Sequence, residues 1–261
     1  MKKLKPIVSK IFDKSGKILL KYFRSDFDTK QKDPKTDDIV TTADLESEKV
    51  ILNILKKNFP KYSILSEENG LIDKNSDYKW IVDPLDGTHN FAHGIPFFAT
   101  ALALKYKEKI IFSAINAPIL KERVFSKENK GTYMNDKKLN VSNSNIEYIK
   151  NSMFQMLGVW NWNNLEFRKI FQNIINKFYS HFRIFGSMAV ASLNIATKRT
   201  NCGLAYNLSP WDIAPAYLTM KEAGTLVTNL KGKKPVFNKK ESIVFSTSKD
   251  IHKILMECVE T

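Results

Sequence analysis

Residues 80–91 read Trp80-Ile81-Val82-Asp83-Pro84-Leu85-Asp86-Gly87-Thr88-His89-Asn90-Phe91. The apolar run that opens this stretch predicts a buried strand that stops at Asp83 and Pro84, and a helix should start near Gly87 and Thr88. In α/β proteins the carboxyl ends of strands face the ligand-binding crevice, and the first N–H groups of a helix attract phosphate. The stretch therefore predicts a site for a phosphorylated ligand, although Asp, Pro and Gly also form ordinary turns.

Helices and strands alternate on both sides of this stretch. Apolar periodicity predicts helices over 4–23, 44–59, 162–178, after Gly186-Ser187, 211–222 and 250–258. The predicted strands are 62–65, 80–82, 98–105, 110–116, 123–126, 182–185, 203–206, 225–228 and 242–246. The segment 24–38 reads as a loop, Asn135-Asp136 as a turn, and the polar segment 140–151 as a boundary. This alternation predicts a layered α/β (α+β) architecture with two parts, residues 1–145 and 146–261.

Composition and charge exclude several classes of protein. The chain has 261 residues, 43% of them hydrophobic, which is typical of a folded protein. Its net charge of +14 comes from scattered lysines, which favours a solvated surface and leaves nucleic-acid binding as an alternative. Charges interrupt the first apolar stretch, and the apolar stretch 94–104 is far shorter than the ~20 residues of a membrane span. Two lone cysteines, Cys202 and Cys258, fit a reducing cytoplasm, where we expect the protein.

Several further motifs follow one another in the order of a known family. They are Asp38-Ile39-Val40-Thr41-Thr42-Ala43-Asp44, Ser66-Glu67-Glu68, Asn116-Ala117-Pro118, Arg183-Ile184-Phe185-Gly186-Ser187, Pro210-Trp211-Asp212-Ile213-Ala214 and Glu222-Ala223-Gly224. With these motifs the chain resembles the inositol monophosphatase family of metal-dependent, lithium-sensitive sugar and polyol phosphatases over most of its length. The resemblance implies a layered α-β-α-β-α sandwich and a homodimer.

Electrostatics gives the acidic residues of these motifs a common role. If Asp44, Glu67, Asp83, Asp86 and Asp212 converge, each like-charged pair at ~4 Å repels by about 4 kcal/mol at an effective dielectric of ~20. Such a cluster needs cations. Oxygen ligands suit Mg²⁺ or Mn²⁺, whereas zinc usually recruits His and Cys side chains, which are scarce here.

The resemblance implies two or three Mg²⁺ ions per active site. Glu67, Asp83 and the backbone carbonyl of Leu85 would hold the first ion, and Asp83, Asp86 and Asp212 the second. Residues 1–145 would thus supply most ligands, and residues 146–261 would complete the site. One ion would lower the pKa of a water that attacks phosphorus, and the other would neutralise the leaving oxygen.

The same resemblance implies catalytic and substrate-binding residues. Thr88 would hydrogen-bond the water, Asp44 would orient the Thr88 hydroxyl and accept a proton, and Glu67 would complete the catalytic set. The amides of Gly87 and Thr88 would bind phosphate. The full set expected at the substrate is Asp86, Gly87, Thr88, Gly186, Ser187, Met188, Asn207 and Asp212.

Plainer interpretations remain open for some of these residues. Asp44 and Asp212 stand at helix starts, where a carboxylate is also favourable as a cap. Glu68 could replace Glu67 as a ligand or be solvated. Arg183 could pair with a partner across a subunit interface or lie at the surface.

The spacing of the two aspartates argues against another phosphatase class. Haloacid dehalogenase phosphatases use D-x-D-G-T, whose aspartates stand at i and i+2, whereas Asp83 and Asp86 stand at i and i+3. In an extended strand only i and i+2 share a face. The observed spacing needs a bend, which Pro84 can provide, and it predicts attack by water without a phosphoenzyme.

Two departures from the family pattern affect the expected substrate. Many inositol phosphatases have a Glu ahead of Trp-Asp, where this chain has Asn207 in a shorter segment, and Met188 replaces a common small Ala. We expect a small polyol or sugar phosphate such as inositol 1-phosphate. Adenosine 3',5'-bisphosphate, fructose 1,6-bisphosphate and histidinol phosphate are alternatives, and a binding protein of RNA or transcription complexes on the same fold is an alternative of another class.

Overall fold

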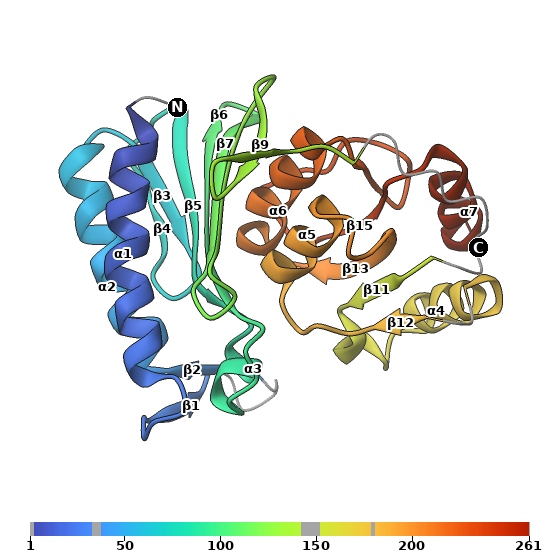
Figure 1. The fold of residues 1–261 in the computed structure, drawn as a ribbon, viewed down its shortest axis with the longest axis horizontal. Coiled ribbons are helices and arrows are strands. Elements are labelled where there is room, and N and C mark those ends of the chain that lie inside the picture. Colours follow the sequence, from blue (N-terminus) through green and yellow to red (C-terminus); the bar gives the residue numbers. More distant parts are fainter. Residues whose placement is uncertain (1–2, 33–37, 142–151, 179–180, 261) are drawn as a thin grey trace.

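The computed structural model describes residues 3–32, 38–141, 152–178 and 181–260. Five layers of helices and sheets follow one another across the molecule (Figure 1). Helices α1 (Leu4–Tyr22) and α2 (Thr42–Asn58) form one outer layer, α5 (Met188–Ala196) and α6 (Pro210–Ala223) the middle one, and α4 (Leu165–Lys177) and α7 (Lys249–Val259) the other outer one. The expected α-β-α-β-α sandwich is therefore confirmed.

The first sheet lies between α1/α2 and the middle helices. Its spatial order is β10 (Lys137–Leu139), β9 (Gly131–Met134), β8 (Glu122–Lys127), β7 (Lys109–Ala117), β6 (Ala99–Tyr106), β5 (Tyr78–Asp86), β3 (Ser63–Ser66) and β4 (Gly70–Ile72). Only β3 and β5 pair in parallel. As a result, β3 and β5 end on the same side of the sheet, and the residues that follow β3 lie beside the end of β5.

The second sheet comes from the C-terminal part of the chain. Its order is β12 (Phe182–Arg183), β11 (Phe154–Leu157), β13 (Cys202–Leu208), β15 (Glu241–Ser246) and β14 (Leu226–Asn229). All strands of the first sheet precede residue 140 and all those of this sheet follow residue 153. The boundary that the sequence places between residues 145 and 146 lies outside the described residues.

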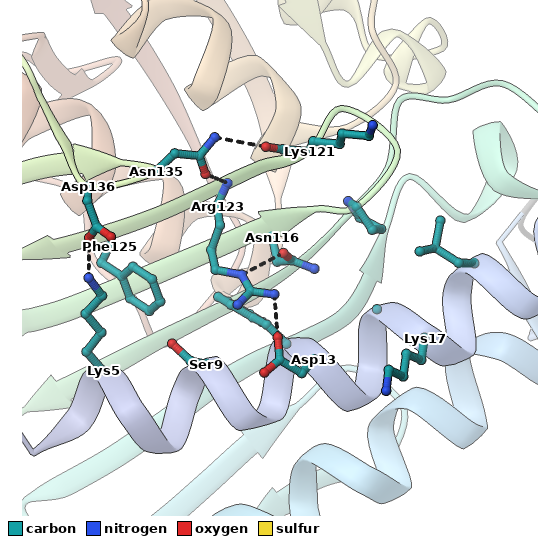
Figure 2. Close-up of a pocket in the computed structure, with 14 residues that line it drawn as sticks. Lys5, Ser9, Asp13, Lys17, Asn116, Lys121, Arg123, Phe125, Asn135 and Asp136 are labelled. Atoms are coloured by element: carbon teal, nitrogen blue, oxygen red, sulfur yellow. Dashed lines mark hydrogen bonds and ion pairs between the residues drawn. The ribbon is translucent and has the colours of Figure 1, made fainter.

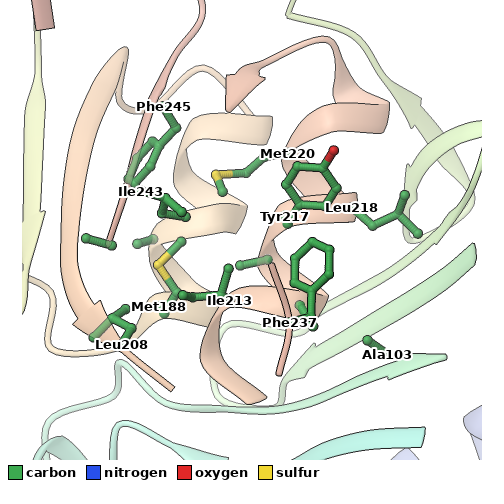
Figure 3. Close-up of a cluster of buried hydrophobic side chains, with 14 of the residues drawn as sticks. Ala103, Met188, Leu208, Ile213, Tyr217, Leu218, Met220, Phe237, Ile243 and Phe245 are labelled. Atoms are coloured by element: carbon green, nitrogen blue, oxygen red, sulfur yellow. The ribbon is translucent and has the colours of Figure 1, made fainter. Parts of the chain in front are cut away.

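Side-chain alternation along β5 shows how the layers pack. Trp80 and Val82 pack under α1 and α2, whereas Ile81 faces the opposite cluster, which contains the middle helices. That cluster includes Met188, Ile213 and Phe245, from α5, α6 and β15 (Figure 3). Apolar burial on both faces of each sheet stabilises the stack.

The structure corrects several sequence expectations. The sequence did not predict the short strands β1 (Thr29–Gln31), β2 (Ile39–Thr41), β4, β9, β10 and β11. β1 lies inside the expected loop 24–38 and pairs with β2, which follows that loop. The strand expected to stop at Asp83 continues to Asp86, and α2 begins at Thr42, two residues early. Pro215 lies inside α6, and nothing in the structure gives it a functional role. None of the helices in the described ranges is long and apolar enough to cross a membrane.

Candidate active site

A β-bulge brings the two aspartates of the central stretch onto one face. Asp83 pairs with Ala101 of β6, and Asp86 pairs with Ala99, so three steps along β5 match two steps along β6. Ala99 and Ala101 share a face, and their partners therefore share one as well. The Pro84 carbonyl inside the bulge accepts hydrogen bonds from Ser47 (3.2 Å) and Thr100 (3.0 Å). The bend expected at Pro84 is thus present and fixed on both sides.

A third carboxylate joins these two from the other half of the chain. Asp212 lies in the first turn of α6, and one carboxylate oxygen each of Asp83, Asp86 and Asp212 lie within 4.8 Å of one another. The Asp212 side chain also accepts a hydrogen bond from the Ser209 N–H at 2.8 Å. The capping role and the cluster role that the sequence left open therefore coexist.

Burial and mutual repulsion make this cluster favour positive charge. Burial, and then the charges of neighbouring acids, raise the pKa of Asp83 and of Asp212 well above the ordinary value. Burial also raises the pKa of Asp86 to about 6, although hydrogen bonds from Ser187 and Ala189 oppose the shift. An all-oxygen set of buried, mutually repelling carboxylates fits a hard divalent cation such as Mg²⁺.

The start of α5 fixes the Asp86 side chain. Oδ2 of Asp86 accepts hydrogen bonds from the Ser187 hydroxyl, at 2.6 Å, and from the Ala189 N–H. Ser187, which the resemblance assigned to the substrate, thus contacts a candidate metal ligand. The Met188 side chain is buried in the core between the sheets.

Glu67 reaches the cluster through the parallel pairing of β3 and β5. Ser66 pairs with Val82, so the next residues, Glu67 and Asp83, lie side by side, and burial and then the charge of Glu67 raise the pKa of Asp83. Lys32 pairs with both Glu67 (2.7 Å) and Glu68 (2.5 Å). Burial lowers the pKa of Lys32, but these two carboxylates outweigh it and raise the pKa overall. Burial raises the pKa of Glu68 to about 7, so Glu68 is not a solvated surface acid.

Thr88 and Asp44 form a hydrogen-bonded pair beside the cluster. The Thr88 hydroxyl lies 3.2 Å from Asp44 Oδ1 and 3.0 Å from the Leu85 carbonyl oxygen. Asp44 Oδ2 accepts hydrogen bonds from the N–H and the hydroxyl of Thr41 at the start of α2. Burial raises the pKa of Asp44 to about 6. Asp44 is therefore both a helix cap and the partner of Thr88.

Gly87 turns the chain from β5 into α3 (Thr88–Ala92). Its φ is +90°, and an added Cβ would lie 2.7 Å from the Phe97 carbonyl oxygen. Only glycine fits this turn without strain. Gly186 has φ +68°, and its Cβ would meet the amide of Asn90, which donates to the carbonyls of Phe97 and Phe185. Asn90 thus ties the turn before α5 to the loop after α3.

Asn207 lies at the end of β13, exposed and with φ +54°. Its side-chain amide donates to Asn161 Oδ1 at 3.0 Å, so its partner comes from the short helix η2 (Val159–Asn161). The structure brings together Asp44, Glu67, Asp83, Leu85, Asp86, Thr88 and Asp212 through one network, whereas Asn207 binds a different neighbour.

Sequence reasoning missed Lys32 and Asn90 as parts of this region. Lys32 follows β1 in a segment expected to be a loop, and no local pattern marks it. Asn90 belongs to the central stretch, but no local pattern there indicates its contact with Phe185.

Comparisons with known proteins point to one family. The sequence profile described as "Inositol monophosphatase family" matches residues 2–261. The chain is 31% identical to the fructose-1,6-bisphosphatase/inositol-1-monophosphatase of Thermotoga maritima, covering 96% of this chain and 95% of that one. It is 30% identical to the Nus factor SuhB of Vibrio cholerae over 76% of this chain and 74% of the relative.

A solved structure is similar over nearly its whole length. The extragenic suppressor protein suhB of Bartonella henselae superposes with a TM-score of 0.90 at 30% identity, covering 99% of this chain and 98% of that one. The match over the whole sequence and the shared fold lead to one conclusion: the chain belongs to the inositol monophosphatase family.

Proposed function

We propose that the protein is a Mg²⁺-dependent phosphomonoesterase that hydrolyses the phosphate ester of a small polyol or sugar, such as inositol 1-phosphate, by attack of water. The observation that carries this proposal is the convergence of the carboxylates of Asp83, Asp86 and Asp212, two of them buried and the third partly buried, beside the start of α3. Family membership supports a phosphatase activity.

The donors divide into two groups around Asp83. Glu67, Asp83 and the Leu85 carbonyl would hold a first ion, and Asp83, Asp86 and Asp212 would hold a second. Mn²⁺ would fit the same oxygen ligands as Mg²⁺, and a third ion would bind near Glu67. When bound, such ions supply Lewis acidity that lowers the pKa of a water and neutralises charge on the leaving oxygen.

Thr88 and Asp44 handle the proton. The Thr88 hydroxyl hydrogen-bonds the attacking water, and Asp44, whose pKa of about 6 leaves it mostly ionised at neutral pH, accepts the proton. The N–H groups of Gly87 and Thr88 bind the phosphate oxygens, and Ser187 keeps Asp86 in place. Gly186, Met188 and Asn207 complete the surroundings of the leaving group.

Phosphate release from inositol 1-phosphate tests the proposal. We expect turnover with Mg²⁺, none with EDTA, and at least a ~10³-fold loss in Asp86→Asn, because this change removes a ligand charge. Asp250→Asn, which alters an exposed aspartate of α7, is the matched control and should keep full activity. Near-normal activity of Asp86→Asn would rule out the assignment.

A substrate panel separates the candidates. Relatives include a protein named for both fructose 1,6-bisphosphate and inositol monophosphate, so fructose 1,6-bisphosphate belongs in the panel with adenosine 3',5'-bisphosphate and histidinol phosphate. Because Asn207 is uncharged, its side chain excludes none of these phosphate esters. The substrate with the highest kcat/KM identifies the class.

The proposal extends to assembly and compartment. Exposed Trp160, Trp162, Leu165 and Ile184 lie on segments around η2, α4 and β12, and they support a homodimer that buries them, with Arg183 nearby. Sedimentation analysis should give twice the monomer mass. The buried free thiols of Cys202 and Cys258 are consistent with a cytoplasmic location.

Relatives named Nus factor SuhB favour a second candidate, an RNA- or transcription-complex-binding protein on the same fold. The net charge of +14 suits a polyanionic partner. Salt-sensitive RNA binding that survives Asp86→Asn would support this function, and no RNA binding at low salt would remove it.

A further inference from the structure

A second pocket lies between α1 and the strands β7 and β8, with the β9–β10 turn at one end (Figure 2). Its volume is about 650 Å³, within the usual range for small-molecule sites. None of the residues of the acidic cluster lines it. It is therefore separate from the candidate active site.

The charged side chains of this pocket leave a positive surplus. Its two acids are already neutralised, because Asp13 pairs with Arg123 at 2.9 Å and Asp136 pairs with Lys5. Among the described residues, no carboxylate pairs with the other two lining lysines, Lys17 and Lys121. Lys17 and Lys121 lie at different ends of the pocket, and their side chains point away from each other (Figure 2). Two uncompensated ammonium groups at its rim attract an anion through long-range electrostatics.

Asn116 supplies a buried, directed donor. It is only 5% exposed, and its Oδ1 accepts a hydrogen bond from Arg123 Nε at 3.1 Å. That bond leaves the amide nitrogen Nδ2 pointing away from the guanidinium (Figure 2), towards α1 at Gly16. Within the described parts of the chain, Nδ2 has no acceptor. Asn116 belongs to the motif Asn116-Ala117-Pro118, which the candidate active site does not use.

The surrounding contacts hold the Arg123 guanidinium and the backbone of Lys121. Arg123 bonds through Nε to Asn116 and through one Nη to Asp13, and it lies over the Phe12 ring at 5.6 Å. Asn135 accepts from the Arg123 N–H and donates to the Lys121 carbonyl, so one side chain fixes both backbones. Among the described residues, no hydrogen bond involves the remaining guanidinium nitrogen, which can donate to a ligand.

Gly16 explains how the helix leaves room for this arrangement. It is buried inside α1, where glycine costs about 1 kcal/mol relative to alanine. A Cβ at this position would lie 3.2 Å from Asn116 Nδ2. The glycine therefore gives the Asn116 amide its position at the edge of the pocket.

We propose that this pocket binds the phosphate group of a small molecule, with Lys17 and Lys121 providing charge and Asn116 Nδ2 and Arg123 donating hydrogen bonds. Inorganic phosphate and a phosphate monoester share this chemistry. The volume of the pocket exceeds what phosphate alone fills, so the monoester should bind more tightly.

Binding is measured by NMR titration of the ¹⁵N-labelled full chain with inorganic phosphate and with ribose 5-phosphate, in EDTA and at low salt. Without divalent cations the carboxylate cluster repels anions, so binding reports on this pocket whether or not the proposed phosphatase function holds. We expect saturable shifts of the Asn116 side-chain amide. Tighter binding of ribose 5-phosphate identifies an ester ligand, and equal or tighter binding of phosphate identifies the free ion.

Three variants make the test specific. Lys17→Ala/Lys121→Ala should raise the Kd about tenfold, whereas Lys10→Ala/Lys14→Ala, which removes the same charge from exposed positions of α1 outside the pocket, should change it less than twofold. Gly16→Ala should weaken binding although alanine favours a helix. Equal affinities of the two double variants, or no saturable shift at Asn116, would overturn the proposal.

Discussion

At the scale of single residues, three aspartates lie side by side, Asp83 and Asp86 buried and Asp212 partly buried, and each prefers a proton or a cation to a bare negative charge. Asp83, Asp86 and Asp212 all have raised pKa values, first because of burial. Removing such charges from water is costly unless they are compensated. In the cation-free protein, protons provide that compensation only below these raised pKa values.

Asp86 makes one defined contribution to the pH dependence of stability. Its pKa rises from 3.8 to about 6 on folding, so between these values the folded chain binds more protons than the unfolded chain. The contribution of Asp86 to the free energy of unfolding is therefore fully present below pH ~4. It is lost as the pH rises through ~6, by at most about 3 kcal/mol. In EDTA at pH 7, the urea concentration at the unfolding midpoint should therefore be higher for Asp86→Asn than for the unaltered protein. This difference between the two midpoints should disappear at pH 4. A difference that does not depend on pH would contradict this.

Lys32 is the cation nearest to Glu67 and Glu68 in the network described above. Lys32→Ala should lower the melting temperature in EDTA, because two carboxylates lose their partner, and it should tighten Mg²⁺ binding a few-fold by removing a competing charge. Calorimetric titration and thermal melts measure both effects. Lys30→Ala, an exposed position of the same hairpin, should change neither. Weaker Mg²⁺ binding in Lys32→Ala would show that Lys32 positions Glu67 and does not compete for it.

At the scale of elements, the turn from β5 into α3 depends on Gly87. Gly87 and Gly70 both have positive φ, but a Cβ at Gly87 would lie 2.7 Å from a carbonyl oxygen, whereas one at Gly70 would meet nothing within 4 Å. Gly70→Ala should cost about 1 kcal/mol for its conformation alone. Gly87→Ala should cost at least twice that and lower turnover, as urea unfolding and phosphate release would show. Similar costs for the two changes would contradict a steric role.

The same elements show how far the sequence can predict the structure. Long periodic helices such as α1, and the bend at Pro84, were predictable because periodicity and an i, i+3 spacing are local signals. The strands β1, β4 and β11 are three or four residues long, and their strand conformation depends on pairing with distant segments. For the same reason, the contact of Lys32 with Glu67 and that of Ser187 with Asp86 could not be predicted.

At the scale of the whole molecule, the acidic cluster joins two layers. Asp83 and Asp86 come from the first sheet, and Asp212 from the middle helices that pack against both sheets. A cation bound by all three should stabilise the folded chain by about 2.7 kcal/mol at 100 times its Kd. Mg²⁺ should raise the melting temperature of the unaltered protein and of Asp250→Asn, and much less that of Asp212→Asn. If Mg²⁺ raised the melting temperature of Asp212→Asn as much as that of the unaltered protein, the middle helices would not contribute to Mg²⁺ binding.

The location of bound metal tests the proposed site most directly. Crystals grown with Mn²⁺ and phosphate give an anomalous difference map in which Mn²⁺ is identified by its scattering. We expect one peak in contact with the carboxylates of Asp83, Asp86 and Asp212, and a second beside Glu67 and the Leu85 carbonyl. A map with no peak in contact with these three aspartates would contradict the metal-dependent phosphatase.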